Sequence, residues 1–149
     1  MSKLFIYYSH SGNGDKVAEY LSARGVQTRK IERKKKLPKN MFGLMMTGGF
    51  LAGIKYKDKV LDYDKNIASY DEIIIGSPIW NGRIACPINT VLSELDLSGK
   101  KVVFIFYSGS GEAFKAVMRI HKEYPDAIFY ILKEPKQYVD QLSSLDNLF

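Results

Sequence analysis

The sequence has one cysteine, two histidines and one tryptophan among its 149 residues. The single cysteine, Cys86, cannot form a disulfide within the chain, which fits a reducing compartment. The histidines and the cysteine lack the spacing of metal ligands, so we expect no metal site. No apolar run reaches the roughly 20 residues that a transmembrane helix needs, and the first apolar run lacks the features of a secretory signal. We therefore expect a cytoplasmic protein with no transmembrane segment.

The length and composition predict one globular domain over residues 1–149, because 46% of the residues are hydrophobic and can form a full core. The net charge of +6 is unevenly distributed, since residues 29–59 hold ten Lys and Arg residues against Glu32 and Asp58. No nucleic-acid-binding motif accompanies this basic segment. We therefore expect no nucleic-acid partner and interpret the segment as a solvated basic edge.

Apolar runs typical of buried strands alternate with helical patterns along the chain. The strand patterns cover residues 3–8, 25–31, 71–76, 100–107 and 127–132. The helical patterns cover residues 15–21, 87–95, 112–124 and 136–145. This alternation predicts an α/β fold with a five-stranded parallel sheet and helices on both faces, which is a three-layer sandwich.

The first predicted strand runs directly into a turn rich in hydroxyl groups and glycine, and a helix follows at once. The turn consists of Ser9, His10, Ser11, Gly12, Asn13 and Gly14. Backbone N–H groups, the serine hydroxyls and the positive end of the helix dipole all favour an anion at this place. Glycine also lets the main chain approach a phosphate closely. The turn therefore predicts a phosphate-binding loop.

Several interpretations compete for this turn. The Walker pattern G-x-x-x-x-G-K-[ST] is absent. A dinucleotide loop would read Gly12-x-Gly14-x-x-Val17 without its third glycine, and Glu32 lies where its ribose-binding acid is expected, so this alternative stays open. The mononucleotide pattern [ST]-x-[ST]-G-x-[ST] fits the turn up to Gly14, which removes one hydroxyl. A hydroxyl-rich turn is also an ordinary helix cap.

Two further loops should meet the first, because the carboxyl ends of parallel strands lie at one edge of the sheet. The third strand leads into Ser77-Pro-Ile-Trp-Asn-Gly-Arg83, which contains the only tryptophan, and the fourth leads into Ser108-Gly-Ser-Gly111. Loops on a rigid edge carry function more often than packing. We therefore expect a ligand site at this edge.

These motifs resemble those of the flavodoxin family, in its short-chain form, over nearly the whole chain. The resemblance implies a flavodoxin-like sandwich with strand order 2-1-3-4-5 and one non-covalent FMN. The first loop would hold the phosphate, and the other two would enclose the isoalloxazine ring, with Trp80 stacking on it at the rim. The implied cofactor-binding residues are Ser9, His10, Ser11, Gly12, Asn13, Gly14, Pro78, Ile79, Trp80, Asn81, Gly82, Ser108, Gly109, Ser110 and Gly111.

The resemblance also implies redox chemistry that the flavin carries, with no catalytic residue demanded of the protein. We interpret the chain as a low-molecular-weight electron-transfer protein. An alternative is an FMN-dependent NAD(P)H:acceptor (quinone) oxidoreductase with its acceptor pocket under residues 40–54, and a second is a non-redox α/β binding domain. The expected partner is a redox protein or a small-molecule electron acceptor. Contact of the basic, methionine-rich segment 34–59 with a membrane surface is a further alternative, and the oligomeric state stays open.

Three residues near these loops carry expectations of their own. His10 would replace the hydroxyl missing at Gly14 if it turned towards the phosphate. Asp15 should point away from the loop, because its charge would repel a phosphate. Cys86 should be a small buried residue rather than a redox thiol.

Overall fold

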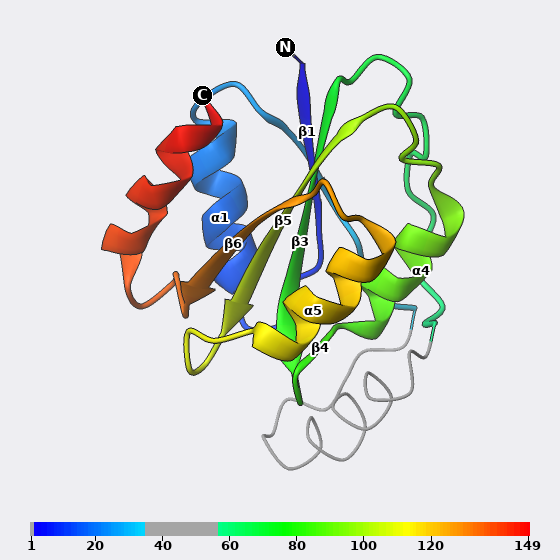
Figure 1. Ribbon diagram of the computed structural model, residues 1–149. Coiled ribbons are helices and arrows are strands. Elements are labelled where there is room, and N and C mark those ends of the chain that lie inside the picture. Colours follow the sequence, from blue (N-terminus) through cyan, green and yellow to red (C-terminus); the bar gives the residue numbers. More distant parts are fainter. Residues whose placement is uncertain (1, 35–56) are drawn as a thin grey trace.

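The computed structural model describes residues 2–34 and 57–149. The strands of the described part form one sheet that makes up the middle layer of the molecule (Figure 1). They are β1 (Lys3–Tyr7), β2 (Gln27–Lys30), β3 (Glu72–Trp80), β4 (Arg83–Ile84), β5 (Lys101–Ser108) and β6 (Ile128–Lys133). Within residues 2–34 and 57–149, three α-helices and one 3-10 helix cover the sheet: α1 (Asn13–Ser22), α4 (Cys86–Glu94), α5 (Phe114–Glu123) and η2 (Val139–Leu148).

The strands lie in the order β2-β1-β3-β5-β6, and every neighbouring pair in this path is parallel. Counted along the chain, these five strands have the predicted order 2-1-3-4-5, so the predicted three-layer sandwich is confirmed. The central strands β1, β3 and β5 are buried almost throughout, which explains their uninterrupted runs of Ile, Val and Phe. The short β4 pairs antiparallel with the end of β3 and was not predicted.

The two faces of the sheet are packed by different helices. On one face, Val17 and Leu21 of α1 and Leu142 and Leu145 of η2 form a core cluster with Phe5 of β1. The other face belongs to α4 and α5 (Figure 1). The predicted helices over residues 87–95 and 112–124 are thus confirmed with small shifts of their ends.

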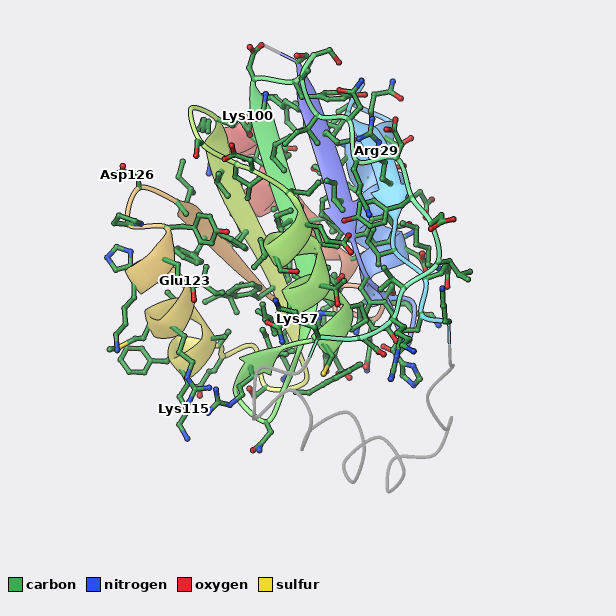
Figure 2. All side chains as sticks on the ribbon, turned by 90° about the vertical axis from the view of Figure 1, so that its right-hand side faces the viewer. Arg29, Lys57, Lys100, Lys115, Glu123 and Asp126 are labelled. Carbon is green, nitrogen blue, oxygen red and sulfur yellow. The ribbon has the colours of Figure 1, made fainter. Side chains whose placement is uncertain are left out.

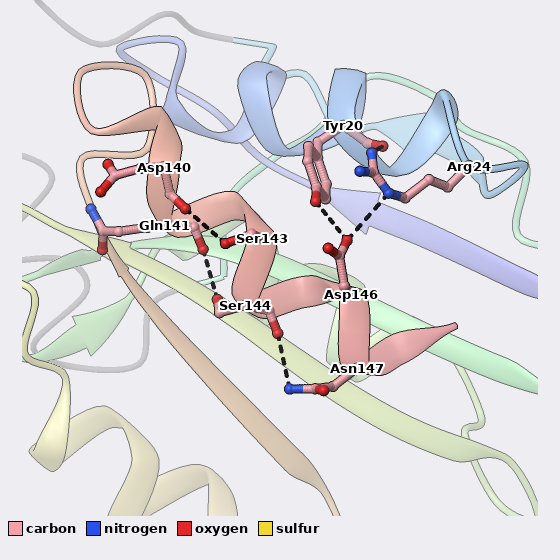
Figure 3. A network of polar contacts seen from close by, with 8 residues as sticks. All are labelled: Tyr20, Arg24, Asp140, Gln141, Ser143, Ser144, Asp146 and Asn147. Atoms are coloured by element: carbon pink, nitrogen blue, oxygen red, sulfur yellow. Dashed lines mark hydrogen bonds and ion pairs between the residues drawn. The ribbon is translucent and has the colours of Figure 1, made fainter.

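The last helix differs from the prediction in type and position, since it is a 3-10 helix over Val139–Leu148 rather than an α-helix over residues 136–145. Ser143 and Ser144 each donate a hydrogen bond to the carbonyl three residues earlier. Such local bonds compete with the α-helical pattern and favour the tighter turn. Tyr20 donates to Asp146 over 2.6 Å, and Arg24 forms an ion pair with Asp146 at 3.3 Å, so η2 is fastened to α1 (Figure 3).

The third strand is longer than predicted and includes most of the expected tryptophan loop. Pro78 pairs with Tyr107 of β5, and the strand ends only at Trp80. Pairing with β1 ends at Gly76, so the rest of β3 has no β1 neighbour to which a proline would have to donate. Pro78, Ile79 and Trp80 are therefore strand residues, and only Asn81 and Gly82 form the turn.

Part of the sequence prediction lies outside the described residues. The segment 40–54, expected as a flap over an acceptor pocket, belongs to this part, as does most of the basic segment 34–59. In residues 2–34 and 57–149, no helix has the length and apolar character needed to cross a membrane.

Candidate functional site

The segments that follow β1, β3, β5 and β6 meet at the carboxyl edge of the sheet. The ring of His10, after β1, lies 6.1 Å from the ring of Trp80, at the end of β3. The N–H of Glu134, after β6, donates to the carbonyl of Ser108, at the end of β5, over 3.1 Å. The structure thus brings the predicted site segments together and adds a fourth from the last strand.

The turn before α1 leaves the start of that helix open. Gly12 is the N-cap residue, with a φ of 98°, and it has no side chain that could accept from the first helical N–H groups. Ser9 Oγ accepts from the N–H of Gly14 over 3.0 Å, which shapes the turn from inside. The N-cap residue itself leaves the helix start without a side-chain cap, and the positive end of a helix favours an anion.

The structure explains why position 14 is a glycine. The sequence suggested only that a phosphate-binding hydroxyl is missing there. A Cβ atom at this position would lie 2.4 Å from the hydroxyl oxygen of Tyr107 and 2.9 Å from Ser9 Cβ. Tyr107 is buried and donates its hydroxyl to the carbonyl of Tyr8. Burial raises the pKa of Tyr107 well above its usual range, so the hydroxyl remains a donor. The space for a side chain at position 14 is already filled.

The charged residue at the start of α1 faces away from the turn. Asp15 accepts from the hydroxyl of Tyr7 over 3.1 Å and forms an ion pair with Lys30 of β2 at 2.9 Å. These partners hold the carboxylate over the β1–β2 side. The negative charge therefore does not oppose an anion at the turn.

Trp80 stands at the rim, half-buried, at the end of β3. Tyr8 meets it edge-on with ring centres 5.9 Å apart, and His10 meets it almost perpendicularly. His10 therefore lies beside Trp80. That it replaces the hydroxyl missing at Gly14 stays a prediction. Burial and the charge of Arg33 lower the pKa of His10 from its ordinary value, so the neutral imidazole is favoured.

The Asn81–Gly82 turn connects β3 to β4 with both residues at positive φ, 50° and 72°. Two consecutive positive φ angles are typical of the two-residue hairpin turn that an Asn-Gly pair favours. The Asn-Gly pair is the sequence signal for this hairpin, which was not among the predicted elements. The turn places its backbone directly after Trp80, which pairs with Arg83 across it.

The loop after β5 is shaped by its own serines. Ser108 is buried, and its hydroxyl accepts from the N–H of Gly111 over 2.9 Å. Ser110 accepts from the N–H of Glu112 over 3.2 Å, and Gly109 is exposed. The side chain of Ser108 is therefore a structural member of the loop, whereas the exposed backbone at Gly109 and Ser110 can meet a ligand.

The segment after β6 adds residues that the sequence analysis missed. The N–H of Lys136 donates to Asn13 Oδ1 over 3.0 Å, and its ammonium donates to the carbonyl of Ser11 over 3.3 Å. Together with Glu134 and Gln137, these residues line a hollow of about 300 Å³ beside the turn. The signal for this segment was available, because the end of the last parallel strand must reach the same edge.

Cys86 begins α4 and is buried, as predicted. Burial, with the nearby charge of Asp58, raises the pKa of its thiol to about 11. A thiol in this state is a poor nucleophile at neutral pH. Cys86 is therefore a packing residue.

The family model described as flavodoxin matches residues 2–144. The chain belongs to the flavodoxin family. No curated protein matches its sequence. Membership in the flavodoxin family agrees with the strand order and with the turn that opens α1.

Three solved structures illustrate how widely the fold of this flavodoxin-family chain occurs. A protein from Bacteroides eggerthii that is described as a flavoprotein has a TM-score of 0.77 and 24% identity, covering 97% of this chain and 96% of its own. A flavoprotein from Lactobacillus acidophilus, solved in complex with FMN, has a TM-score of 0.70 and 23% identity, with 95% and 98% covered. An NADH:FMN oxidoreductase in its apo form has a TM-score of 0.54 and 12% identity, with 99% and 86% covered. At these identities the likeness shows the fold.

Proposed function

We propose that this chain binds one FMN non-covalently and works as a small electron-transfer protein. The observation that carries the proposal is the open start of α1 next to Trp80. Gly12 has no side chain to cap the helix start, although Ser9 Oγ accepts from the N–H of Gly14. The half-buried indole of Trp80 contacts the same turn through His10. One end of this arrangement suits a phosphate and the other an aromatic ring. Membership in the flavodoxin family supports FMN as the ligand that joins the two.

The residues of the site fit this cofactor in separate roles. The turn from Ser9 to Gly14 would hold the phosphate through backbone N–H groups, and Lys136 would add a positive charge beside it. Trp80 would stack on the ring, while the backbone of the Asn81–Gly82 turn and of Gly109 would meet its polar edge. When bound, FMN supplies the capacity to accept and donate electrons, and the protein sets its affinity, access and potential.

A second candidate is an FMN-dependent oxidoreductase that uses NAD(P)H. The specific observation in its favour is that an NADH:FMN oxidoreductase shares the fold with a TM-score above one half. In this alternative a small molecule delivers hydride at the same edge of the sheet. We place either function in the cytoplasm.

Cofactor binding and turnover separate these functions. The purified full-length chain is mixed with FMN, passed through gel filtration and examined by visible absorbance. Retained flavin absorbance supports the proposal, and a protein that emerges colourless at micromolar concentration contradicts it and favours a non-redox binding domain. Steady oxidation of NADH or NADPH with a quinone by the loaded protein would favour the oxidoreductase, whereas its absence together with rapid reduction of a protein acceptor favours the electron carrier.

The Trp80→Ala variant tests the placement of the ring. We expect FMN to bind about 2 kcal/mol more weakly, because stacking and apolar burial are lost. Fluorescence titration of FMN gives the dissociation constant. Phe149→Ala is the matched control, since Phe149 is an exposed aromatic residue at the other end of the molecule (Figure 1). Equal FMN affinity in both variants would remove Trp80 from the site.

A further inference from the structure

The outer face of α5 exposes large apolar side chains close to the proposed flavin site. Phe114, the first residue of α5, is 74% exposed, and Met118, one turn later, is 48% exposed. The opposite face of the helix buries Ala116 and Ile120. Since residues four apart lie on the same face of a helix, Phe114 and Met118 form one apolar stripe that faces solvent. The stripe begins directly after the loop of Ser108 to Gly111.

Cations border this stripe on the side of the flavin site. A Cβ atom at Gly82 would lie 3.2 Å from Lys115 Cδ, so the Lys115 side chain rests on the Asn81–Gly82 turn. Arg119 lies near Arg83 of β4, and burial together with this like charge lowers the pKa of Arg83. The guanidinium groups of Arg83 and Arg119 therefore lie close together. Among the described residues, Arg119 Nη1 is buried and has no acceptor for its hydrogen bonds.

The carboxylates of the same segment stand at its ends. Glu112 precedes α5 and Glu123 is its last residue, whereas Lys115, Arg119 and Lys122 lie between them. Figure 2 shows Lys115 and Glu123 towards opposite ends of the helix. Lys115 is at the end that lies beside the Asn81–Gly82 turn. We call the set of Arg83, Phe114, Lys115, Met118 and Arg119 the α5 platform. Its three cations outnumber the neighbouring carboxylate of Glu112, and Phe114 and Met118 give it an exposed apolar part.

The composition of the α5 platform favours a protein as its occupant. Aromatic residues, Met and Arg are enriched at protein–protein interfaces, whereas a nucleic-acid surface depends on cations and polar groups. A side chain as exposed as Phe114 protrudes from the surface and so does not enclose a small molecule. Positive charge at the border is complementary to an acidic partner, and it would also speed the encounter.

We propose that an acidic electron-carrying protein docks on the α5 platform and exchanges electrons with FMN at the neighbouring Trp80 edge. This inference rests on the proposed function, because the exchange needs bound flavin. In the direction tested below, one electron leaves the reduced FMN and reduces the ferric haem of the partner. No covalent bond forms or breaks between the two proteins.

The experiment uses stopped-flow mixing of the full-length, FMN-loaded and photoreduced protein with an acidic ferric cytochrome over a series of salt concentrations. A basic ferric cytochrome serves as the control for charge sign. The variants are Lys115→Glu and Phe114→Ser, both at exposed positions that contribute little to the core. Lys100→Glu is the matched control, because it makes the same charge change at the opposite end of the molecule (Figure 2). The FMN dissociation constant of each variant is measured first and should be unchanged.

We expect the unmodified protein to reduce the acidic cytochrome faster than the basic one at low salt. Lys115→Glu should slow the reaction with the acidic cytochrome about tenfold at low salt, and the difference should shrink as salt rises. Phe114→Ser should slow it at every salt concentration, since it removes apolar contact. Lys100→Glu should change the rate far less.

Three results would overturn the docking proposal while leaving FMN binding intact. One is a Lys115→Glu rate equal to that of Lys100→Glu, and another is faster reduction of the basic cytochrome. The third is binding of the loaded protein to vesicles of anionic lipid that Phe114→Ser abolishes, which would assign the platform to a membrane. A chain that retains no FMN overturns both the docking and the proposed function.

Discussion

At the amino edge of the sheet the charges are paired with one another, whereas at the carboxyl edge the backbone is left open. The amino edge buries Glu72 completely, and its carboxylate lies 2.9 Å from Lys3 Nζ and 3.4 Å from Lys101 Nζ. The carboxyl edge instead has an uncapped helix start at Gly12 and a turn with two positive φ angles at Asn81 and Gly82. One edge closes the fold, and the other can meet a ligand.

The cavities of the two edges show that size does not identify the site. A hollow of about 500 Å³ lies at the amino edge between residues 95–102 and 123–127, and it is larger than the hollow of about 300 Å³ beside Ser11. Two of its polar groups have partners: Lys100 Nζ donates to the carbonyl of Tyr70 over 2.7 Å, and Asp96 accepts from the N–H of Ser98. The helix start at Gly12 and the turn at Asn81 and Gly82, rather than volume, distinguish the carboxyl edge.

The largest effect we expect comes from breaking the buried charge group of the amino edge. Glu72→Gln should lower the free energy of unfolding by about 3 kcal/mol, because Lys3 and Lys101 lose the anion between them. The FMN dissociation constant should stay the same, since the change lies at the far end of the sheet. Urea unfolding followed by circular dichroism measures the stability, and FMN titration measures the affinity.

Glu19→Gln is the matched control for that change. Glu19 pairs with Lys16 at 3.2 Å on the solvent face of α1, and such surface pairs contribute only about 0–1 kcal/mol. If Glu72→Gln were as stable as Glu19→Gln, the buried pair would be unimportant for the fold. A loss of FMN affinity without loss of stability would show that the two edges are coupled.

The next effect concerns the glycine that keeps the carboxyl edge open. Gly14→Ala should destabilise the protein by about 2 kcal/mol and weaken FMN binding, because its Cβ would overlap the hydroxyl of Tyr107. Tyr107→Phe removes that hydroxyl, so the double variant should recover part of the FMN affinity that Gly14→Ala loses. Thermal unfolding and FMN titration of the two single variants and the double variant check this. Additive losses would contradict the steric explanation.

Most of the sheet was predictable because its central strands are apolar without interruption. The end of β3 was not, because Pro78 argues locally against a strand, and its tolerance depends on β1 ending opposite Gly76. The type of η2 was likewise hidden, since Ser143 and Ser144 form the bonds that tighten it only in the folded chain. Secondary-structure propensity reflects only the local sequence. The end of β3 and the 3-10 geometry of η2 depend on contacts that form in the folded chain.

The parts of the site that lie within one continuous segment were predictable from the sequence. The parts that depend on contacts between distant segments were not. The turn before α1 and the tryptophan after the third strand follow directly from the order of residues. Lys136 reaches Asn13 across 123 positions of the chain, so no local pattern indicates it. The reason for Gly14 is also distant, because Tyr107 belongs to β5.

Replacing Lys136 should have a smaller effect on FMN affinity, and it tests whether this lysine acts at the carboxyl edge. Lys136→Met should weaken FMN binding by about 1 kcal/mol at low salt, because a partly exposed ammonium beside the phosphate is lost. Riboflavin, which has no phosphate, should bind both proteins equally. Lys133→Met is the control, since Lys133 is an exposed lysine of β6 that lies over the ring of Tyr138. Equal losses for riboflavin and FMN would contradict a role at the phosphate.

The smallest effect should come from His10, the titratable ring at the border between the phosphate turn and Trp80. Its pKa in the folded protein is lowered below the ordinary value of 6.5, first by burial and then by Arg33. The unfolded chain therefore takes up a proton more readily, and the free energy of unfolding should fall as the pH drops through about 6.5. His10→Asn keeps the size of the side chain and removes the titration. Urea unfolding of both proteins between about pH 8 and pH 5 should show a shallower decline in His10→Asn, and the difference should vanish well above pH 6.5, where the histidine is neutral in both states. Parallel declines in the two proteins would mean that His10 has the same pKa in the folded and the unfolded chain. Burial beside Trp80 and the charge of Arg33 would then have no effect on its protonation.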